Sequence, residues 1–216
     1  MALNHAVTLR IARDPHSIVE FQRLLFHTYC IKMKWHDPER FPDGIFRDEY
    51  DPSSVFLTIH EESRLVGGTR LVYDSERGFP HEELSRVSLP EPPHPGVPEK
   101  MRECLRQSGR TRIMEVTRFI AEPSARRIHT YDLMKAIYWY GINHGIGAYF
   151  MVVDMQTFLL CHKLGFSLVP IGIPLFCEGS WTIPATMIVE DMANLKTEVR
   201  EYFLSTDNLE GSWIPT

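Results

Sequence analysis

Apolar residues recur along the chain with two periods, and each period predicts a different kind of element. From Ser17 to about Trp35 they recur every three or four residues, which predicts an amphipathic helix with a capping box of Ser17 and Glu20. Further helices are expected at Pro98–Arg106, Ser124–Asn143, Gln156–Leu164 and Asp191–Phe203. Short apolar runs predict strands at Val55–His60, Leu65–Tyr73, Arg112–Ala121, Tyr149–Asp154, Phe166–Pro170 and Thr182–Val189.

The order of these elements narrows the fold class. Residues 55–60 and 65–73 are separated by a short polar connection and are expected to form a hairpin. The long helix between the strands at 112–121 and 149–154 predicts a parallel, right-handed crossover. Six prolines lie between Asp74 and Pro98, so regular structure is not expected there. The pattern predicts a mixed α/β chain.

Composition places the chain among ordinary globular proteins. At 216 residues, with 44% hydrophobic and 24% charged residues, it is expected to form one domain over residues 1–216. The net charge of −5 argues against a nucleic-acid partner. Four widely spaced cysteines are expected to be reduced, and no signal peptide or membrane span is expected, which predicts a cytoplasmic protein.

Two charges interrupt an otherwise apolar strand. Met114–Ile120 has the composition of a buried strand, yet it contains Glu115 and Arg118. Burying either charge alone is costly, so each must pair or meet a charged ligand. Side chains alternate along a strand, and residues three apart share a face only across a β-bulge. A bulge around Val116-Thr117 is therefore expected if the two act together; a structural ion pair is the alternative.

Arg70 is a second charge in a strand, and an acidic loop precedes it. The adjacent Gly67-Gly68 is unusual in a strand interior and indicates a bend or the close approach of a ligand or backbone. Upstream, the loop carries Asp48 and Asp51. An exposed sheet face for Arg70 and a solvated loop for the aspartates are the alternatives.

In chain order, Asp48-x-x-Asp51, Arg70-Leu71 and Glu115-x-x-Arg118-Phe119 resemble acyl-homoserine-lactone synthases and their relatives, the long-chain N-acyl amino acid synthases. The resemblance runs from about Phe26 to Phe166, and Lys163-Leu164-Gly165-Phe166 is similar to a helix end common in Gcn5-related N-acyltransferases. It implies an α/β (α+β), GNAT-like acyl-CoA N-acyltransferase fold. Such a fold has a central mixed, mostly antiparallel sheet flanked by helices and splayed between the strands near residues 112–121 and 148–154.

The first helix separates two branches of this group. Lactone synthases carry an Arg, a Phe and a Trp there that are associated with S-adenosylmethionine. Here Trp35 matches, Tyr29 replaces the Phe, and Arg23 lies two positions too early. The resemblance therefore favours an N-acyl amino acid synthase, with Trp35 as a substrate-binding residue; a lactone autoinducer synthase using S-adenosylmethionine is the alternative.

The start of the long helix bears on the acyl donor. Coenzyme A-using members of the fold have a glycine-containing loop around the pyrophosphate, whereas residues 126–131 contain no glycine. Acyl carrier protein delivers acyl-phosphopantetheine without the adenosine diphosphate portion. It is therefore the implied donor and partner, with acyl-CoA as the alternative. Arg126, Arg127 and Lys135 are candidate contacts to the acidic carrier, or simply a solvated helix start.

The implied reaction is attack of an amine on a thioester carbonyl, which needs orientation, a proton acceptor and oxyanion stabilisation. Glu115 is the candidate general base, and a backbone N–H near Phe119 is the candidate oxyanion donor. Arg70 and Arg118 are expected to hold the loop aspartates or the carboxylate of the acceptor, because a guanidinium pairs bidentately with carboxylates.

The acyl chain is expected to lie in the split between the two parallel strands, under Phe119, Tyr138, Phe150 and Val152, each of which is also explained as an ordinary core residue. No permanent cofactor is expected, and the ten histidines show no metal-ligand spacing. A small-molecule acetyltransferase and a non-catalytic acyl- or carrier-binding module on the same fold are further alternatives.

Overall fold

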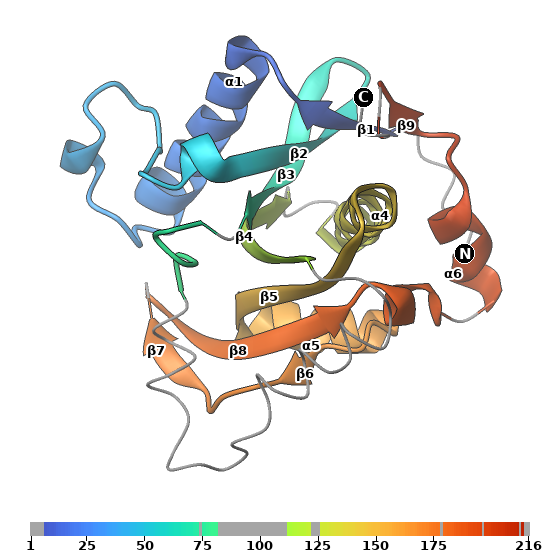
Figure 1. Ribbon diagram of the computed structural model, residues 1–216. Coiled ribbons are helices and arrows are strands. Elements are labelled where there is room, and N and C mark those ends of the chain that lie inside the picture. Colours follow the sequence, from blue (N-terminus) through green and yellow to red (C-terminus); the bar gives the residue numbers. More distant parts are fainter. Residues whose placement is uncertain are drawn as a thin grey trace.

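The computed structural model describes residues 7–73, 75–81, 112–121, 126–177, 179–195, 197–211 and 213, without the side chains of residues 112, 126, 127, 197 and 198. The predicted helix Pro98–Arg106 and most of the proline-rich segment lie outside this description. Figure 1 shows the arrangement of the described elements around one twisted sheet.

The described helices are α1 (Pro15–Phe26), α4 (Arg126–His144), α5 (Met155–Leu164) and α6 (Thr197–Leu204). The first helix begins at Pro15, two residues before the predicted start at Ser17. It is capped by Asp14, whose Oδ1 accepts a hydrogen bond from the backbone N–H of Ser17 at 2.9 Å. Ser17 is therefore not the N-cap, because Pro15 fits the first helical position better. Beyond Phe26 the helix widens into a π-helical turn over His27–Lys32.

The described strands are β1 (Val7–Ala12), β2 (Ser54–Glu61), β3 (Arg64–Tyr73), β4 (Arg112–Ala121), β5 (Ile146–Asp154), β6 (Val169–Pro170), β7 (Leu175–Cys177), β8 (Ser180–Ile188) and β9 (Leu209–Glu210). They form one sheet in the order β6-β8-β5-β4-β3-β2-β1-β9, with β7 paired to β8. The pairs β4–β5 and β1–β9 are parallel and the rest antiparallel. The predicted mixed, mostly antiparallel sheet and the parallel pairing of β4 with β5 are confirmed, whereas β1, β7 and β9 were not predicted.

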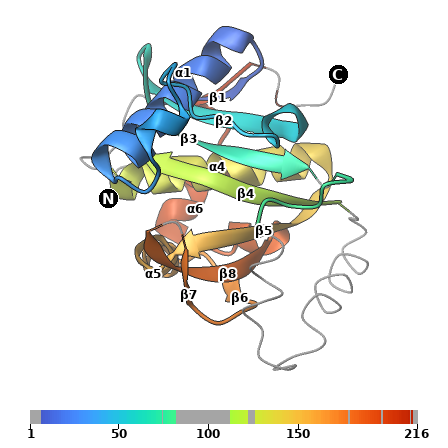
Figure 2. The same cartoon turned by 90° about the vertical axis from the view of Figure 1, so that its left-hand side faces the viewer.

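The sheet splits between its two central parallel strands. β4 pairs with β5 from Arg112 to Val116, and the last pair joins Val116 to Met151. Beyond this pair the described residues of the two strands are not paired with each other. Figure 2 shows the carboxyl ends of the two strands moving apart. The predicted splay is therefore confirmed.

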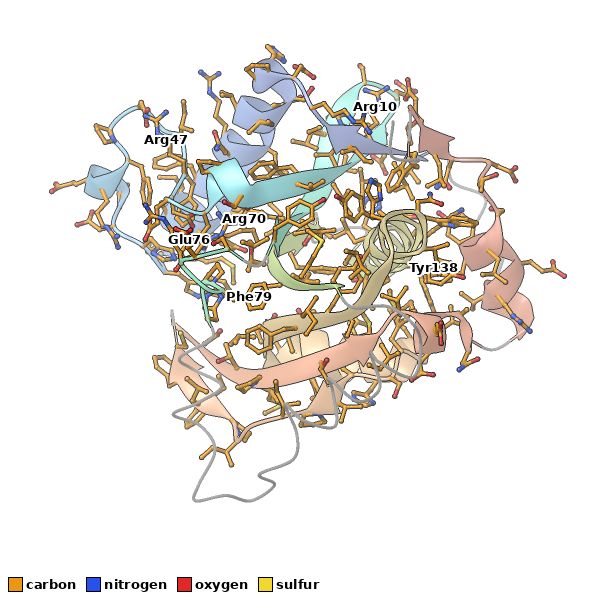
Figure 3. The ribbon with its side chains drawn as sticks, in the orientation of Figure 1. Arg10, Arg47, Arg70, Glu76, Phe79 and Tyr138 are labelled. Atoms are coloured by element: carbon orange, nitrogen blue, oxygen red, sulfur yellow. The ribbon has the colours of Figure 1, made fainter. Side chains whose placement is uncertain are left out.

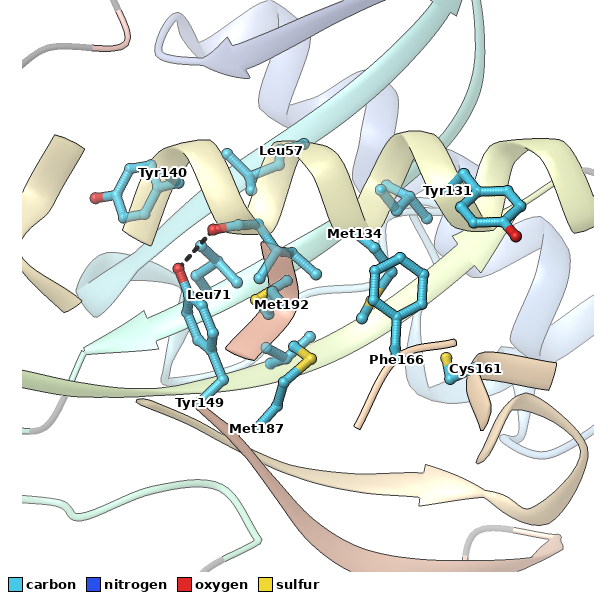
Figure 4. Close-up of a cluster of buried hydrophobic side chains, with 14 of the residues drawn as sticks. Leu57, Leu71, Tyr131, Met134, Tyr140, Tyr149, Cys161, Phe166, Met187 and Met192 are labelled. Carbon is cyan, nitrogen blue, oxygen red and sulfur yellow. Dashed lines mark hydrogen bonds between the residues drawn. The ribbon is translucent and has the colours of Figure 1, made fainter. Parts of the chain in front are cut away.

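Helices cover both faces of the sheet. On one face, Phe21 and Leu25 of α1 pack with Phe56 in a small aromatic-rich core. On the other face α4, α5 and α6 enclose the larger core, which Figure 4 shows around Met134, Tyr149 and Phe166. Within it the Tyr149 hydroxyl donates to the Ile137 carbonyl at 2.8 Å, which ties β5 to its crossover helix.

The two glycines of β3 have a packing role. A Cβ on Gly68 would lie 2.5 Å from Cε2 of Phe21 and 2.8 Å from the Leu57 carbonyl oxygen, and one on Gly67 would lie 2.8 Å from the Ile120 carbonyl oxygen. The close approach that the sequence indicated is thus to protein atoms. It allows α1 to sit directly on the sheet.

Candidate functional site

A cavity of about 910 Å³ begins where β4 and β5 separate. It is bounded by the last residues of both strands, by α4 and α5, by the π-helical turn, and by the β7–β8 hairpin. Its inner wall is largely apolar and includes Met134, Ile137, Met151, Cys161 and Leu168. Because it is lined from helices on both faces, the cavity passes through the split in the sheet.

Trp35 packs across one border of the cavity. It lines the cavity, and a Cβ on Gly179 would lie only 2.5 Å from its indole Cδ1. Gly179 has a φ of +84°, so glycine is favoured there for both space and conformation. Phe176 and Trp181 on the same hairpin also line the cavity, yet their side chains are 65% and 59% exposed. This border is therefore an opening to solvent with aromatic walls.

Arg70 and the two loop aspartates form one buried charge cluster. Arg70 is 1% exposed, and its Nη1 donates to Asp48 Oδ1 at 2.6 Å and to Asp51 Oδ1 at 2.5 Å. Its Nε donates to Thr117 Oγ1 at 2.9 Å, and Gln22 donates to Asp51 at 2.7 Å. The sequence-based prediction that these residues assemble is confirmed, and the exposed-face alternative for Arg70 is wrong.

The two carboxylates differ in electrostatics. Burial opposes ionisation of Asp48, but the hydrogen bond and charge of Arg70 outweigh it, so the pKa of Asp48 lies below its usual value. Burial raises the pKa of Asp51, and Arg70 offsets this only partly. The pKa of Arg70 is raised because its two acidic partners outweigh the opposing effect of burial. The cluster therefore holds one firmly ionised carboxylate between two arginines.

Arg118 connects this cluster to the cavity. Its Nη2 donates to Asp48 Oδ2 at 3.1 Å, and its guanidinium lies 4.4 Å from the ring centre of Phe46 and 5.7 Å from that of Tyr29. Arg118 also lines the cavity. Aromatic faces stabilise a cation that is largely removed from water.

A β-bulge places Arg118 there. Gly68 and Arg70 on β3 are separated by one residue, but their partners Ile120 and Thr117 on β4 are separated by two. Arg118 has a φ of +56°, in the left-handed region. The bulge predicted from charge spacing exists, but it lies at Arg118 and the residue after it and not at Val116-Thr117.

Glu115 is fully buried and does not appear among the described residues that line the cavity. Its Oε1 lies 2.5 Å from Nδ1 of His81, and its Oε2 accepts the His81 backbone N–H at 3.2 Å. His81 does line the cavity. Glu115 contacts His81 whereas Arg118 contacts Asp48, and Glu115 is connected to the cavity wall through His81.

Sequence reasoning missed His81. The residue stands in a proline-containing loop, 34 positions before Glu115, and no spacing rule links the two. The single available signal was the buried charge itself, which required a polar partner from elsewhere in the chain.

Of the four residues expected to surround the acyl chain, two line the cavity and two do not. Phe119 and Val152 line the cavity. Tyr138 instead packs against Phe203 at a ring separation of 5.1 Å, and Figure 3 shows it on α4 away from Arg70 and Phe79. Phe150 pairs in register with Glu115 and its ring lies 6.3 Å from that of Phe79. Neither Tyr138 nor Phe150 is among the described residues lining the cavity.

Lys135 is not available for a surface contact. It is 0% exposed, donates to Ser205 Oγ at 3.0 Å, and lies 4.2 Å from the ring centre of Tyr202. Burial lowers its pKa to about 8. The prediction of a carrier contact fails here because Lys135 faces α6. Arg126 and Arg127 are the first residues of α4, and their side chains lie outside the description.

No group of three or more His, Cys, Asp or Glu side chains in the described ranges could hold a metal ion. No described helix is long and apolar enough to cross a membrane. Among the described cysteines, Cys30, Cys161 and Cys177 form no disulfide bond.

Known proteins similar to this chain include N-acyl amino acid synthases and acyl-homoserine-lactone synthases. The family model described as N-acyl amino acid synthase FeeM matches residues 20–188. Among curated proteins, an isovaleryl-homoserine lactone synthase from Bradyrhizobium diazoefficiens is 26% identical over 185 residues, which cover 85% of this chain and 78% of that protein.

Solved structures of two such synthases share the fold of this chain. BjaI, a CoA-dependent acyl-homoserine lactone synthase with bound MTA, superposes with a TM-score of 0.69 at 20% identity, covering 96% of this chain and 95% of that one. FeeM, an N-acyl amino acid synthase from uncultured soil microbes, superposes with a TM-score of 0.62 at 15% identity, covering 91% and 98%. At these identities the superpositions establish the fold.

Proposed function

Because the chain belongs to the N-acyl amino acid synthase family, whose members are acyltransferases, we propose that it transfers a long-chain fatty acyl group from acyl carrier protein to the amino group of an amino acid. The observation that carries this proposal is the cavity through the split sheet. It has an apolar inner wall for an acyl chain, and Arg118 and His81 stand in its wall where β4 leaves β5. Its volume of about 910 Å³ lies at the upper end of the usual range for small-molecule pockets.

Arg118 is our candidate for binding the acceptor's carboxylate. Arg70 is occupied by Asp48, Asp51 and Thr117 and is not among the described cavity-lining residues. Arg118 lines the cavity, and a guanidinium binds carboxylates in a planar, bidentate manner. The buried cluster then serves to fix Asp48, which in turn orients Arg118.

The reaction needs no enzyme nucleophile. The acceptor amine attacks the thioester carbonyl, and the oxyanion that forms requires hydrogen-bond donors. Beyond Val116, the described residues of β4 do not pair with β5. The bulge in β4 also takes one residue out of regular pairing with β3. We assign oxyanion stabilisation to the backbone N–H of Phe119 on this basis.

The donor is assigned from the first turn of α4. Thr130, the fifth residue of α4, lines the cavity, so the start of the helix borders it. Residues 126–131 contain no glycine to admit a pyrophosphate closely, which favours phosphopantetheine carried by acyl carrier protein over coenzyme A. We propose Arg126 and Arg127 as contacts to the acidic carrier.

A lactone autoinducer synthase is the second candidate. The similarity to isovaleryl-homoserine lactone synthase over 85% of the chain favours it. Its acceptor, S-adenosylmethionine, also carries an α-amino group and a carboxylate, so Arg118 would bind it in the same manner. The two functions therefore differ in the acceptor side chain and in the product.

Mass spectrometry of reaction products separates the candidates. The purified protein is incubated with acyl carrier protein or coenzyme A thioesters of short, medium and long chains, together with amino acids or S-adenosylmethionine. An N-acyl amino acid formed from the carrier thioester supports the proposal; an acyl lactone, or strict dependence on coenzyme A, contradicts it.

The acceptor assignment is tested with a matched pair of variants. Arg118→Gln should raise KM for the acceptor at least tenfold because the carboxylate loses its charged partner. Arg47→Gln, which removes an exposed guanidinium paired with Asp43, should leave KM unchanged. An unchanged acceptor KM in Arg118→Gln would refute this role.

A further inference from the structure

We propose that His81 exchanges the proton with the reacting amine and that Glu115 is a positioning residue that orients the His81 ring. The inference rests on the proposed acyl transfer and changes the assignment of the general base that the sequence suggested. It follows from which of the two side chains reaches the cavity and from how the other is occupied.

Glu115 is poorly placed to meet a substrate. Its side chain is 0% exposed and is not among the described residues of the cavity wall. Both of its oxygens already bind His81, one at the ring and one at the backbone. A general base must lie within hydrogen-bonding reach of the proton it accepts, directly or through one water. An amine could reach Glu115 only by displacing His81.

His81 meets that requirement. It lines the cavity, and 19% of its side chain is exposed. Nδ1 of His81 lies 2.5 Å from Oε1 of Glu115, and a hydrogen bond donated by the ring to this oxygen requires the ring proton on Nδ1, which leaves the lone pair on Nε2. No described residue forms a hydrogen bond to Nε2. The clamp on both the ring and the backbone fixes the ring orientation, as a carboxylate does for a catalytic histidine in a hydrolase triad.

The proton balance of the reaction is complete with this one group. The neutral amine forms a C–N bond with the thioester carbonyl carbon, and His81 Nε2 takes one proton from the resulting ammonium. The C–S bond then breaks as the carbonyl re-forms, and His81 returns the proton to the thiolate. The products are an amide and a free thiol, and His81 is again neutral. Glu115 stabilises the transient imidazolium without being protonated itself.

The alternative is a purely structural bond that fastens residues 75–81 to β4. A structural bond predicts that loss of His81 lowers stability and activity together. A proton-transfer role predicts a loss of kcat with little change in stability, and a dependence of the Glu115 effect on the presence of His81.

A cycle of variants tests the assignment. His81→Gln should lower kcat about 10²–10³-fold while acceptor KM changes little. Glu115→Gln should also lower kcat, but adding it to His81→Gln should lower kcat less than twofold further, because Glu115 acts through His81. His16→Gln on the exposed side of α1 is the matched control and should retain full activity. Thermal unfolding of every variant reports on folding.

Exogenous imidazole provides a second readout. It should restore part of the kcat of His81→Ala with a saturable concentration dependence, and it should restore none in Glu115→Gln. The inference is overturned if His81→Gln keeps more than half of the wild-type kcat, or if Glu115→Gln lowers kcat as strongly in the His81→Gln background as in wild type.

These outcomes are distinct from failure of the proposed function. Wild-type protein that transfers no acyl group from any carrier or coenzyme A thioester refutes the function. Wild-type protein that turns over normally while His81 proves dispensable refutes only the assignment of the base.

Discussion

The buried Arg70 cluster gives the sharpest prediction on stability. Arg70→Met removes a guanidinium that is 1% exposed and leaves the partly buried carboxylates of Asp48 and Asp51 side by side without it. Breaking a buried ion pair in this way costs about 3–5 kcal/mol, because the remaining charge is neither solvated nor paired. Arg118 still contacts Asp48, so we expect the lower half of that range, about 3–4 kcal/mol.

The chain offers a matched control for burial. Arg47 and Asp43 form an ion pair at 2.6 Å, as short as that between Arg70 and Asp48, but the Arg47 side chain is 59% exposed. Arg47→Met should therefore cost less than about 1 kcal/mol. Both free energies of unfolding are obtained from urea denaturation followed by tryptophan fluorescence, with equal m-values confirming that the native states are comparable.

Acid provides the internal check on the cause. Without Arg70, partial burial raises the folded-state pKa of the Asp48 and Asp51 carboxyls, so they bind protons more readily in the folded than in the unfolded state. Such groups stabilise the variant as pH falls, so its deficit relative to wild type should shrink between about pH 7 and pH 5. A deficit below about 1 kcal/mol, or one that is constant over this window, would refute the electrostatic reasoning.

Three further predictions concern single positions. The pKa of Lys135 is lowered from 10.5 to about 8 in the folded protein, so the unfolded state binds more protons between these two pH values. The free energy of unfolding should therefore rise with pH across this range, by on the order of 3 kcal/mol. Urea titrations of Lys135→Met should lack this rise, and parallel pH curves for the variant and the wild type would contradict the prediction. Gly68→Ala should lower the free energy of unfolding by about 1–3 kcal/mol, because its methyl group would overlap the ring of Phe21; a loss below about 0.5 kcal/mol by urea denaturation would contradict this. Val152→Trp should lower kcat/KM for the longest accepted acyl chain at least tenfold and spare short chains, which a panel of thioesters would measure; an equal loss for every chain length would argue against Val152 in the acyl pocket.

Much of the fold was predictable because its signals are local. Apolar spacing identified α1, α5 and the strands β2 to β5, and Gly165 ends α5 as expected, with a φ of +98°. The missed strands differ in this respect. β7 and β9 have only three and two residues and show no such signal, whereas β1 has apolar Val7, Leu9 and Ile11 alternating with polar Thr8 and Arg10, a local pattern that the sequence interpretation overlooked.

In the candidate site, the features that depend on tertiary structure were the ones that sequence reasoning missed. The resemblance to acyl-homoserine-lactone synthases led to the prediction that Arg70 would hold the two loop aspartates or the acceptor's carboxylate, and a buried guanidinium does need a carboxylate partner. Lys135 was wrongly assigned to the surface because its neighbours on α4 do not reveal that α6 covers it. The partner of Glu115 comes from a loop whose approach depends on tertiary structure.

The bulge and the split act on the same half of β4, and together they create the site. Up to Val116 the strand is held between β3 and β5, and beyond it only the β3 side is paired. The extra residue then shifts the register on β3 and turns Arg118 into the left-handed conformation, at a cost on the order of 1–3 kcal/mol. That cost is offset by the ion pair with Asp48 and by the aromatic faces of Tyr29 and Phe46. A strand in regular pairing with β5 would leave no cavity, and one without the bulge would leave no cation in its wall. Asp48, held by Arg70, thus supports a strained strand end at which Arg118 lines the cavity.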